Sequence, residues 1–459
     1  DRIMAFYRYL FVTVLVSISA TVFTQSHRVV RVTDPAVSNA NEVSIAINPT
    51  DPRNLIVVSR ARSSANGGRS TSFDYVSEDE GITWRTRRVI NPGRRTQGDD
   101  SVAFSADGVA HHAFIAFRGL RDVRPEAPAN GIFVTSSSDR GASWTDSVAV
   151  VDHRNTVMPF EDKPYVVVDR IKNSRHKGNV YIAWTRFDVY GSHDSGDQSH
   201  IFFSHSSDAG KTFRAPVRIS DVPGDAVDSD GTVEGAMPAV GVNGDVYVVW
   251  AGPSGLVFDR SRDGGWTFGD DKVIMATPGG WDIDIAGLSR HNGMPVTRVD
   301  YSGGPNHGSV YVNWIDERHG DPDVFIMASR DAGETWTGAV RVNTDAVGNK
   351  VEQMFTWLAI DPVDGSVNVI FYDRDGLKGT LTRVLLARSV DGGRTFVNHA
   401  IALPAFSSNE EIFFGDYSGI DAFGGLVAPV FMHFVDSIET AVSVALFKFE
   451  PNTQILLTP

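Results

Sequence analysis

One short phrase occurs six times along the chain, and it constrains the fold more than any other feature of the sequence. Each copy follows the pattern Ser-x-Asp-x-Gly-x-Thr/Ser-Trp/Phe. The copies begin at Ser77, Ser137, Ser206, Ser261, Ser329 and Ser389. A phrase copied at intervals of roughly 60 residues indicates that one supersecondary unit is repeated around an array.

The residues around each phrase predict four strands per unit. In one unit, KPYVVVD at Lys163 is followed by the more aromatic NVYIAWTRF at Asn179. A third run, HIFFSHS at His200, leads into the phrase, and a fourth, APVRIS at Ala215, leaves it. Such β-branched and aromatic runs between turn residues are typical of short strands. Four antiparallel strands per unit, repeated radially, predict an all-β fold of the β-propeller type.

The two ends of the chain decide the number of blades. The last unit has a third strand, AVSVALFKF at Ala441, but neither a phrase nor a fourth strand. The first unit is preceded by an unpaired strand, HRVVRVT at His27. Pairing that strand with the last unit would close the ring and remove an exposed sheet edge. We therefore predict seven blades, with the phrase in six of them, and keep six blades as the alternative.

The phrase itself has a structural explanation. Its Asp can accept backbone hydrogen bonds in a turn, its Gly permits a positive φ, and its final Trp or Phe buries a large ring beside the hairpin. We therefore expect the six phrase aspartates to stabilise the fold and not to catalyse a reaction: Asp79, Asp139, Asp208, Asp263, Asp331 and Asp391.

Charge and composition exclude several classes of function. The formal net charge is -14 at pH 7, which opposes binding to nucleic acid because phosphate contacts need basic patches. The chain has no Cys, so it has neither disulfides nor thiolate metal sites. No zinc-type histidine spacing and no phosphate-binding glycine loop is present.

The N-terminal segment predicts export. An apolar stretch of about 15 residues follows Arg8, which suits the core of a secretory signal better than a spanning helix. We assign residues 1–26 to a signal peptide, or alternatively to an N-terminal membrane anchor, and residues 27–459 to the propeller. The expected location is extracellular or periplasmic, and the expected protein is a monomer.

The starts of the innermost strands predict the site. In a propeller these starts converge on one mouth, where ligands bind. The polar residues at these positions give an expected acidic mouth: Glu42, Asp99, Asp100, Glu161, Asp162, Lys163, Glu234, Arg298, Glu352, Gln353, Asp416 and Tyr417. Crowded carboxylates raise one another's pKa and permit a division into acid and base. Each single acid can equally cap backbone groups or pair with Lys163 or Arg298.

A second acidic segment raises the question of a metal. Asp225, Asp228, Asp230 and Glu234 could hold a hard cation such as Ca²⁺, but they lack the full EF-hand spacing. We expect a solvated loop, no metal site and no cofactor.

The repeated phrase closely resembles the Asp-box, or BNR repeat, of sialidase (neuraminidase) propellers, and the likeness covers nearly the whole chain after the signal. The segments GDDSVAFSADG, FEDKPYVVVD and FFGDYSGI are similar to those of secreted sialidase-like proteins. The resemblance implies an exo-α-sialidase-like glycoside hydrolase with a Tyr nucleophile, an Asp acid/base and arginines that hold a substrate carboxylate.

Matching this pattern to the chain gives a candidate for each role. Tyr417 is the nucleophile with Asp416 beside it, and Asp100 or Asp162 is the acid/base, with Glu161 adjacent. The residues expected to bind an acidic sugar are Arg298, Lys163, Glu42, Glu352 and Arg374. The chain departs from the family at Asn41-Glu42-Val43-Ser44, which puts an acid where the family has its first Arg.

The sequence thus predicts a secreted hydrolase of a glycan. The alternative is a non-catalytic propeller that binds glycan or protein through the same mouth. A polysaccharide lyase also remains open, because a Tyr beside a cation can abstract a proton next to a uronate carboxylate.

Overall fold

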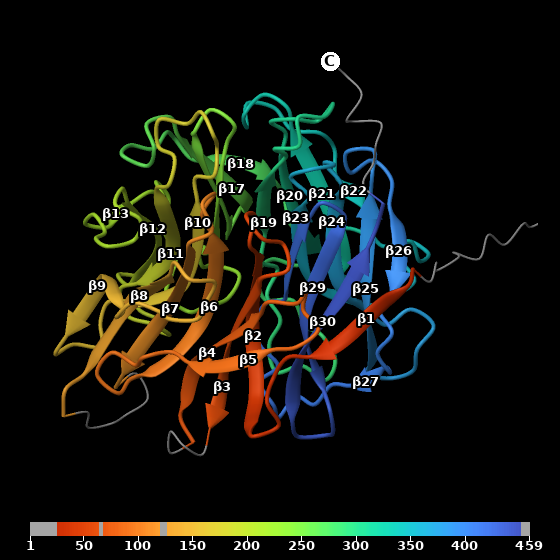
Figure 1. The fold of residues 1–459 in the computed structure, drawn as a ribbon, viewed down its shortest axis with the longest axis horizontal. Coiled ribbons are helices and arrows are strands. Elements are labelled where there is room, and N and C mark those ends of the chain that lie inside the picture. Colours follow the sequence, from red (N-terminus) through yellow and green to blue (C-terminus); the bar gives the residue numbers. More distant parts are fainter. Residues whose placement is uncertain (1–24, 64–67, 120–125, 451–459) are drawn as a thin grey trace, which may run out of the picture.

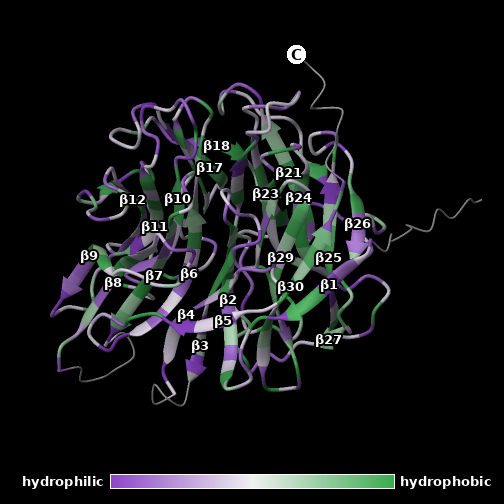
Figure 2. Ribbon diagram, viewed as in Figure 1, coloured by the Kyte–Doolittle hydropathy of each residue, from purple (hydrophilic) through white to green (hydrophobic). Residues whose placement is uncertain are grey.

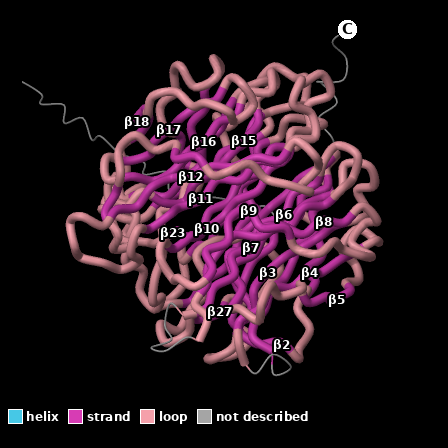
Figure 3. Tube along the Cα trace, turned by 90° about the vertical axis from the view of Figure 1, so that its left-hand side faces the viewer, coloured by secondary structure: helices cyan, strands magenta, loops and turns pink. Residues whose placement is uncertain are grey.

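The computed structural model describes residues 25–63, 68–119 and 126–450, and these residues form seven antiparallel sheets. Each sheet is one blade of a β-propeller, and the described residues contain strands and loops but no helix (Figures 1 and 3). The predicted all-β propeller with seven blades is therefore confirmed. None of the described residues belongs to a helix long and apolar enough to cross a membrane.

Blades 1 to 6 follow one another in the chain, each running from an innermost to an outermost strand. Blade 1 consists of β2 (Val37–Ile47), β3 (Leu55–Ser63), β4 (Ser70–Ser77) and β5 (Arg85–Arg88); blade 2 of β6 (Thr96–Phe104), β7 (Ala110–Arg118), β8 (Ala129–Ser137) and β9 (Val148–Arg154); blade 3 of β10 (Phe160–Val168), β11 (Val180–Phe187), β12 (Gln198–Ser206), β13 (Val217–Arg218) and the short β14 (Gly224–Asp225).

Blade 4 consists of β15 (Glu234–Val240), β16 (Val246–Gly252), β17 (Gly255–Ser261) and β18 (Lys272–Met275); blade 5 of β19 (Val296–Val299), β20 (Val310–Asp316), β21 (Asp323–Ser329) and β22 (Val340–Arg341); blade 6 of β23 (Gln353–Ile360), β24 (Val367–Asp373), β25 (Leu381–Ser389), β26 (Val397–Ala400) and the short β27 (Phe406–Ser407).

Blade 7 joins the two ends of the chain. It contains β28 (Gly419–Phe423), β29 (Leu426–Phe434) and β30 (Thr440–Lys448), and its outermost strand is β1 (His27–Arg31). β1 runs antiparallel to β30, with His27 opposite Phe447, and Figure 1 shows the two strands side by side. The predicted pairing of the N-terminal strand with the last blade is confirmed. The predicted signal peptide, apart from residues 25 and 26, lies outside the described residues.

The core lies between the blades. The strands are mostly hydrophobic and the connecting loops mostly hydrophilic (Figure 2). The second strands of blades 3, 4 and 5 bury Trp184, Trp250 and Trp314 completely. Each ring packs where neighbouring blades meet and stabilises the ring of blades by the removal of apolar surface from water.

The repeated phrase forms the same hydrogen-bonded turn in all six copies. In the first copy, the Ser77 hydroxyl donates to Asp79 Oδ1 at 2.8 Å and accepts from the amide of Gly81 at 2.8 Å. The Thr83 amide and hydroxyl donate to the two carboxylate oxygens of Asp79 at 2.9 and 2.7 Å. Gly81 has a φ of 80°, which a residue with a Cβ rarely adopts. These contacts confirm the structural role expected for the phrase.

A β-bulge near the beginning of the innermost strand positions the site. The pairing register shifts at this point in blades 1, 2, 3, 4 and 6. In the first three blades the bulge holds Glu42, Asp99 and Lys163 at φ values of 54°, 53° and 49°. A left-handed backbone is uncommon for such residues and costs about 1–3 kcal/mol, so the surrounding fold must maintain it. Bulges re-aim side chains, and here each one carries a charged side chain at the mouth.

Candidate functional site

A cavity of about 710 Å³ lies over the beginnings of blades 1, 2 and 3. Its charged lining comes from the bulges of the inner strands, from the ends of β3 and β7, and from loops of blades 4 and 7: Glu42, Asp99, Asp162, Asp416, Arg60, Arg62, Arg69, Arg118, Lys163 and Arg290. Aromatic rings complete the wall: Phe117, Phe160, Tyr190 and Phe413. The mouth is therefore more basic than we expected from the sequence.

Lys163 is the cation at the floor of this cavity. Its ammonium group lies 2.5 Å from Glu234 Oε1, 3.3 Å from Asp162 Oδ2 and 3.5 Å from Asp416 Oδ2. The side chain is only 2% exposed. Burial opposes its charge, but the surrounding carboxylates outweigh burial and raise the pKa of Lys163 well above its ordinary value. Lys163 thus stays charged and holds three blades together.

Asp99 and Asp162 form a carboxyl pair beside Lys163. Burial raises the pKa of Asp99 well above its ordinary value, and the negative charges of Glu42 and Asp162 and a hydrogen bond to Asp162 raise it further. Burial and these neighbours thus favour the protonated form of Asp99. A carboxyl group in such surroundings can donate a proton where a solvated carboxylate could not.

Asp416 remains ionised on the opposite side of the floor. Arg290 binds it through Nε at 2.9 Å and also through Nη2. Burial acts to raise the pKa of Asp416, but Arg290 and Lys163 outweigh it and hold this pKa below its ordinary value. On the cavity floor, burial thus favours the protonated form of Asp99, while Arg290 and Lys163 favour the ionised form of Asp416.

Arg290 comes from the long loop between β18 and β19 and reaches over the mouth. Its Nη1 also lies 3.0 Å from Asp228 Oδ2, which accepts a hydrogen bond from the Tyr190 hydroxyl at 2.8 Å. The guanidinium groups of Arg290 and Arg60 lie 5.3 and 5.1 Å from the centre of the Phe413 ring. These contacts fix Phe413 as an aromatic part of the wall.

The acidic segment considered for Ca²⁺ does not converge on one point. Asp225 accepts from the amide of Val227, and Asp230 accepts from the amides of Trp281 and Asp282. Asp228 instead bonds to Arg290 and Tyr190. Within residues 25–63, 68–119 and 126–450, no group of three or more His, Asp or Glu has a metal-holding arrangement.

Tyr417 lies below the floor and does not line the cavity. It is 4% exposed, and its ring centre lies 5.7 Å from that of Trp357, which in turn lies 5.6 Å from Tyr165. Burial, reinforced by Asp99 and Glu42, raises the pKa of Tyr417 well above its ordinary value. The three rings pack against one another, and the phenol of Tyr417 stays protonated there.

Arg298 lies in a different cavity from Lys163. Its guanidinium donates to the Tyr165 hydroxyl at 3.0 Å, and it lines a small axial cavity of about 90 Å³ between the inner strands. The expectation that Arg298 and Lys163 share one rim is therefore wrong. The reason is register: β19 begins late, after the long loop that carries Arg290, so its first charged residue lies deeper in the channel.

Asp100 and Glu161, although adjacent to cavity residues, point into the blades. Asp100 Oδ1 and Asp74 Oδ1 each lie 2.7 Å from a ring nitrogen of His112, and all three side chains are completely buried. Glu161 accepts hydrogen bonds from Trp184 Nε1 at 2.5 Å and Arg186 Nε at 2.8 Å. Both acids are thus occupied by partners inside the sheets.

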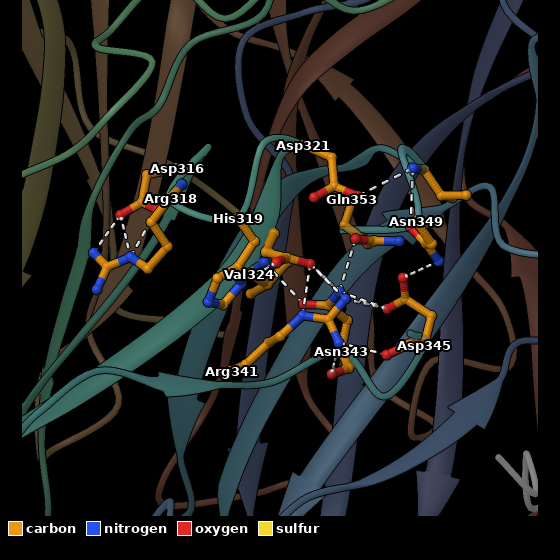
Figure 4. A network of polar contacts seen from close by, with 12 residues as sticks. Asp316, Arg318, His319, Asp321, Val324, Arg341, Asn343, Asp345, Asn349 and Gln353 are labelled. Carbon is orange, nitrogen blue, oxygen red and sulfur yellow. Dashed lines mark hydrogen bonds and ion pairs between the residues drawn. The ribbon is translucent and has the colours of Figure 1, made fainter. Parts of the chain in front are cut away.

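Blades 5 and 6 carry a polar network of their own (Figure 4). Asn343 donates to Gln353 Oε1 and to Asp323 Oδ1, both at 2.7 Å, and Gln353 donates to Asp373 Oδ1 at 2.9 Å. Nearby, Arg374 Nη1 lies 3.6 Å from Glu352 Oε2. Glu352 and Arg374 therefore pair with each other away from the cavity.

The structure thus brings four of the predicted site residues together: Glu42, Asp162, Lys163 and Asp416. Asp99, which the sequence also placed at the mouth, joins them. Sequence reasoning missed Arg60, Arg290 and Tyr190 as cavity residues. Arg60 near the end of β3 could have been found, because second strands end where inner strands begin, whereas nothing in the sequence places the loop of Arg290.

No protein-family model and no curated protein matches the sequence. A leech intramolecular trans-sialidase complexed with 2,7-anhydro-Neu5Ac aligns with 76% of this chain and 67% of its own, at 13% identity and a TM-score of 0.50. A GH93 α-L-arabinofuranosidase of Fusarium graminearum with arabinobiose aligns with 82% of this chain and 98% of its own, at 12% identity and a TM-score of 0.49. A Dyadobacter fermentans protein of unknown function aligns with 92% of this chain and 99% of its own, at 13% identity and a TM-score of 0.48. At such identities the chain is similar to the leech protein in fold alone.

Proposed function

We propose that this protein is a glycoside hydrolase and that it cleaves a glycan in the cavity over blades 1 to 3. The observation that carries the proposal is the pair of Asp99 and Asp162 in a cavity of oligosaccharide size. Cleavage of a glycosidic bond needs a carboxylic acid that protonates the leaving oxygen and a second carboxylate near the sugar ring. Asp99 and the ionised Asp416 suit these two roles.

Asp99 is the proton donor in this mechanism. Burial favours its protonated form, so Asp99 gives its proton to the leaving oxygen, and the water that then attacks the sugar returns a proton to Asp99. Asp416, held ionised by Arg290 and Lys163, stabilises the positive charge that develops on the sugar. The rings of Tyr190, Phe413 and their neighbours offer apolar surface to the faces of the sugars.

A sialoside is one member of this substrate class, and it has less support than the class itself. A sialidase needs guanidinium groups directed at a substrate carboxylate. Arg290 is already bound to Asp416, and Arg60 lies 3.4 Å from Glu42, so protein carboxylates occupy both. The likeness in fold to a trans-sialidase that holds a sialic acid derivative supports a glycan ligand without fixing the sugar.

The nucleophilic role of Tyr417 does not enter the proposal. The phenol lies below the floor, and burial and neighbouring acids disfavour its ionised form. A substrate that reached it would first have to displace Asp416 or Asp99.

The test is hydrolysis of a panel of polysaccharides and aryl glycosides, including a sialoside and an arabinofuranoside, by wild type and three variants. We expect Asp99→Asn to reduce turnover about 10²- to 10⁴-fold, because it removes the acid, and Asp162→Asn to reduce it less. Asp270→Asn, on an exposed loop outside the cavity, is the matched control and should keep full turnover. Equal turnover in Asp99→Asn and the control would refute the mechanism.

A non-catalytic glycan-binding propeller is the second candidate. It is favoured by the ion pairs of the floor, since Asp416, Glu42 and Glu234 already have cationic partners. This candidate predicts heat of glycan binding in calorimetry with no product after long incubation. Release of any product that depends on Asp99 would exclude it.

A further inference from the structure

The cations that line the cavity divide into two groups. Arg60, Lys163 and Arg290 on the floor each lie within 3.4 Å or less of a protein carboxylate. Arg62, Arg69 and Arg118 form the outer wall, from the ends of β3 and β7 and the start of β4. Among the described residues, no carboxylate forms an ion pair with these three wall arginines.

The contacts of the wall arginines leave charge available to a ligand. Arg69 Nη1 donates to the carbonyl of Arg94 at 3.2 Å, and Arg118 donates through Nε and Nη2 to the carbonyl of Ala127 at 2.8 and 2.6 Å. A carbonyl orients a guanidinium group but does not neutralise it. Arg62 and Arg69 are exposed, and Arg118 is half-buried.

This local excess of positive charge contrasts with the whole molecule. The chain carries a formal net charge of -14, so three wall arginines that form no ion pair with the described residues do not reflect a generally basic surface. Like charges that line one cavity repel one another unless a ligand of opposite sign lies between them. Guanidinium groups bind carboxylates and sulfates through paired hydrogen bonds, which favours them over lysines for this purpose.

We propose that the glycan is anionic and that Arg62, Arg69 and Arg118 bind the carboxylate or sulfate groups of sugars next to the cleaved bond. The inference rests on the proposed function and names its substrate class. The sugar that reacts lies over Glu42, Asp99 and Asp416 and is neutral, because the ionised Asp416 would repel a negative group placed there. In this arrangement the cavity recognises the charge of the sugars that lie next to the cleaved bond.

An anionic glycan fits the cavity better than a nucleic acid does. The acidic floor and the net negative charge of the protein repel a phosphodiester chain with one charge per nucleotide. A glycan that alternates charged and neutral sugars can place its charges on the wall only. We therefore include an oligonucleotide as an arm of the test.

The test is calorimetric binding to two matched pairs of probes. The first pair is a hyaluronan tetrasaccharide, in which charged glucuronate alternates with neutral N-acetylglucosamine, and its neutral methyl ester. The second pair is cellotetraose sulfated on alternate sugars and unmodified cellotetraose, which differ only in sulfate. We expect at least one charged probe to bind about tenfold or more tightly than its neutral partner, and the pair that responds distinguishes carboxylate from sulfate.

Variants of the wall connect this preference to the arginines. We expect Arg69→Ala and Arg118→Ala each to weaken binding of the charged probe about fivefold, and the double variant about twentyfold, with little change for the neutral probe. Arg69→Glu keeps an exposed charged side chain and should weaken binding further. Arg218→Ala, an exposed arginine on β13 outside the cavity, is the control and should change nothing.

Three outcomes would overturn the inference: equal binding of charged and neutral probes, wall variants that match the control, or tighter binding of an eight-nucleotide oligothymidylate. These outcomes are separate from failure of the proposed function. Wall-dependent binding without turnover would leave the inference standing and remove the hydrolase. Hydrolysis of a neutral glycan with the same kcat/KM in all wall variants would support the hydrolase and overturn the inference about the wall arginines.

Discussion

Two sets of carboxyl groups in this molecule are chemically alike, but their surroundings shift their pKa values in opposite directions. The aspartates of the repeated phrase lie near the surface, and hydrogen bonds from Thr335 and Ser329 lower the pKa of Asp331 to about 2. The carboxyl groups on the bulges of the inner strands are buried, and burial raises the pKa values of Glu42 and Asp99. The turns thus favour the ionised form of the first set, and burial favours the protonated form of the second.

The difference shows that the backbone decides which acid can do chemistry. In the phrase, a turn presents several N–H and O–H donors to a carboxylate that remains in contact with water. On the bulges, a left-handed residue directs the acid toward other acids and away from water. The experiments below test whether the phrase aspartates affect only stability and whether the acids on the bulges also affect activity.

The largest effect in stability should come from Lys163, which offsets the buried acids. Lys163→Met leaves Asp162, Glu234 and Asp416 without their shared cation, and we expect a loss of about 3–5 kcal/mol in the free energy of unfolding. Urea denaturation measures it. Lys172→Met, an exposed lysine at the other end of β10, is the control. A loss below about 1 kcal/mol would mean that the buried acids do not need the charge of Lys163 to be accommodated in the fold.

The second effect depends on pH and concerns His112, between blades 1 and 2. Burial opposes its charge, but Asp74 and Asp100 outweigh burial and raise the pKa of His112 to about 9, from 6.5. The imidazolium therefore stabilises the fold fully below pH 6.5, and this contribution, about 3 kcal/mol, is lost as pH rises through 9. His112→Gln should be less stable than wild type at pH 6 and approach it at pH 9.5. A constant difference across this range would contradict the assignment.

A smaller effect is expected when one phrase is broken. Asp331→Ala removes the acceptor for Thr335 and Ser329, and we expect the melting temperature to fall by roughly 1–3 °C while kcat/KM stays the same. Differential scanning calorimetry and a turnover assay measure the two. An inactive but equally stable variant would break the division between the two sets.

The smallest effect should follow Tyr417→Phe. The hydroxyl lies below the floor, so we expect kcat/KM to remain within about threefold of wild type. Trp357→Phe, which alters the same stack of rings, serves to calibrate the effect of repacking. A loss of about a thousandfold with a normal melting temperature would restore Tyr417 as the nucleophile.

The fold was predictable from the sequence because the signals are local and repeated. Each phrase carries its own turn chemistry, and the unpaired strand at His27 had one partner that would close the ring. Five cavity residues were also predictable, since the starts of the inner strands must meet. Neighbouring residues then separated: Asp416 lines the cavity while Tyr417 faces the channel, and Asp162 lines it while Glu161 faces Trp184. Which neighbour lines the cavity depends on where the inner strand starts and, in blade 3, on a bulge, and residue type reveals neither of these backbone properties.

Contacts between residues far apart in the sequence could not be predicted, for a different reason. Arg290 and Asp416 are 126 residues apart, and the loop that joins them in space has no periodic pattern. Arg298 was misplaced because blade 5 begins its inner strand late. Such positions depend on loop length and packing, which the repeated phrase does not encode.

The pairing of β1 with β30 also governs when the cavity exists. Asp416 precedes blade 7, and blade 7 is complete only when the first strand of the chain joins the last. During synthesis, blades 1 to 3 and their acids emerge from the ribosome well before Asp416 does. A nascent chain therefore holds an unfinished pocket throughout translation, and competence to bind a substrate arrives in a single late step.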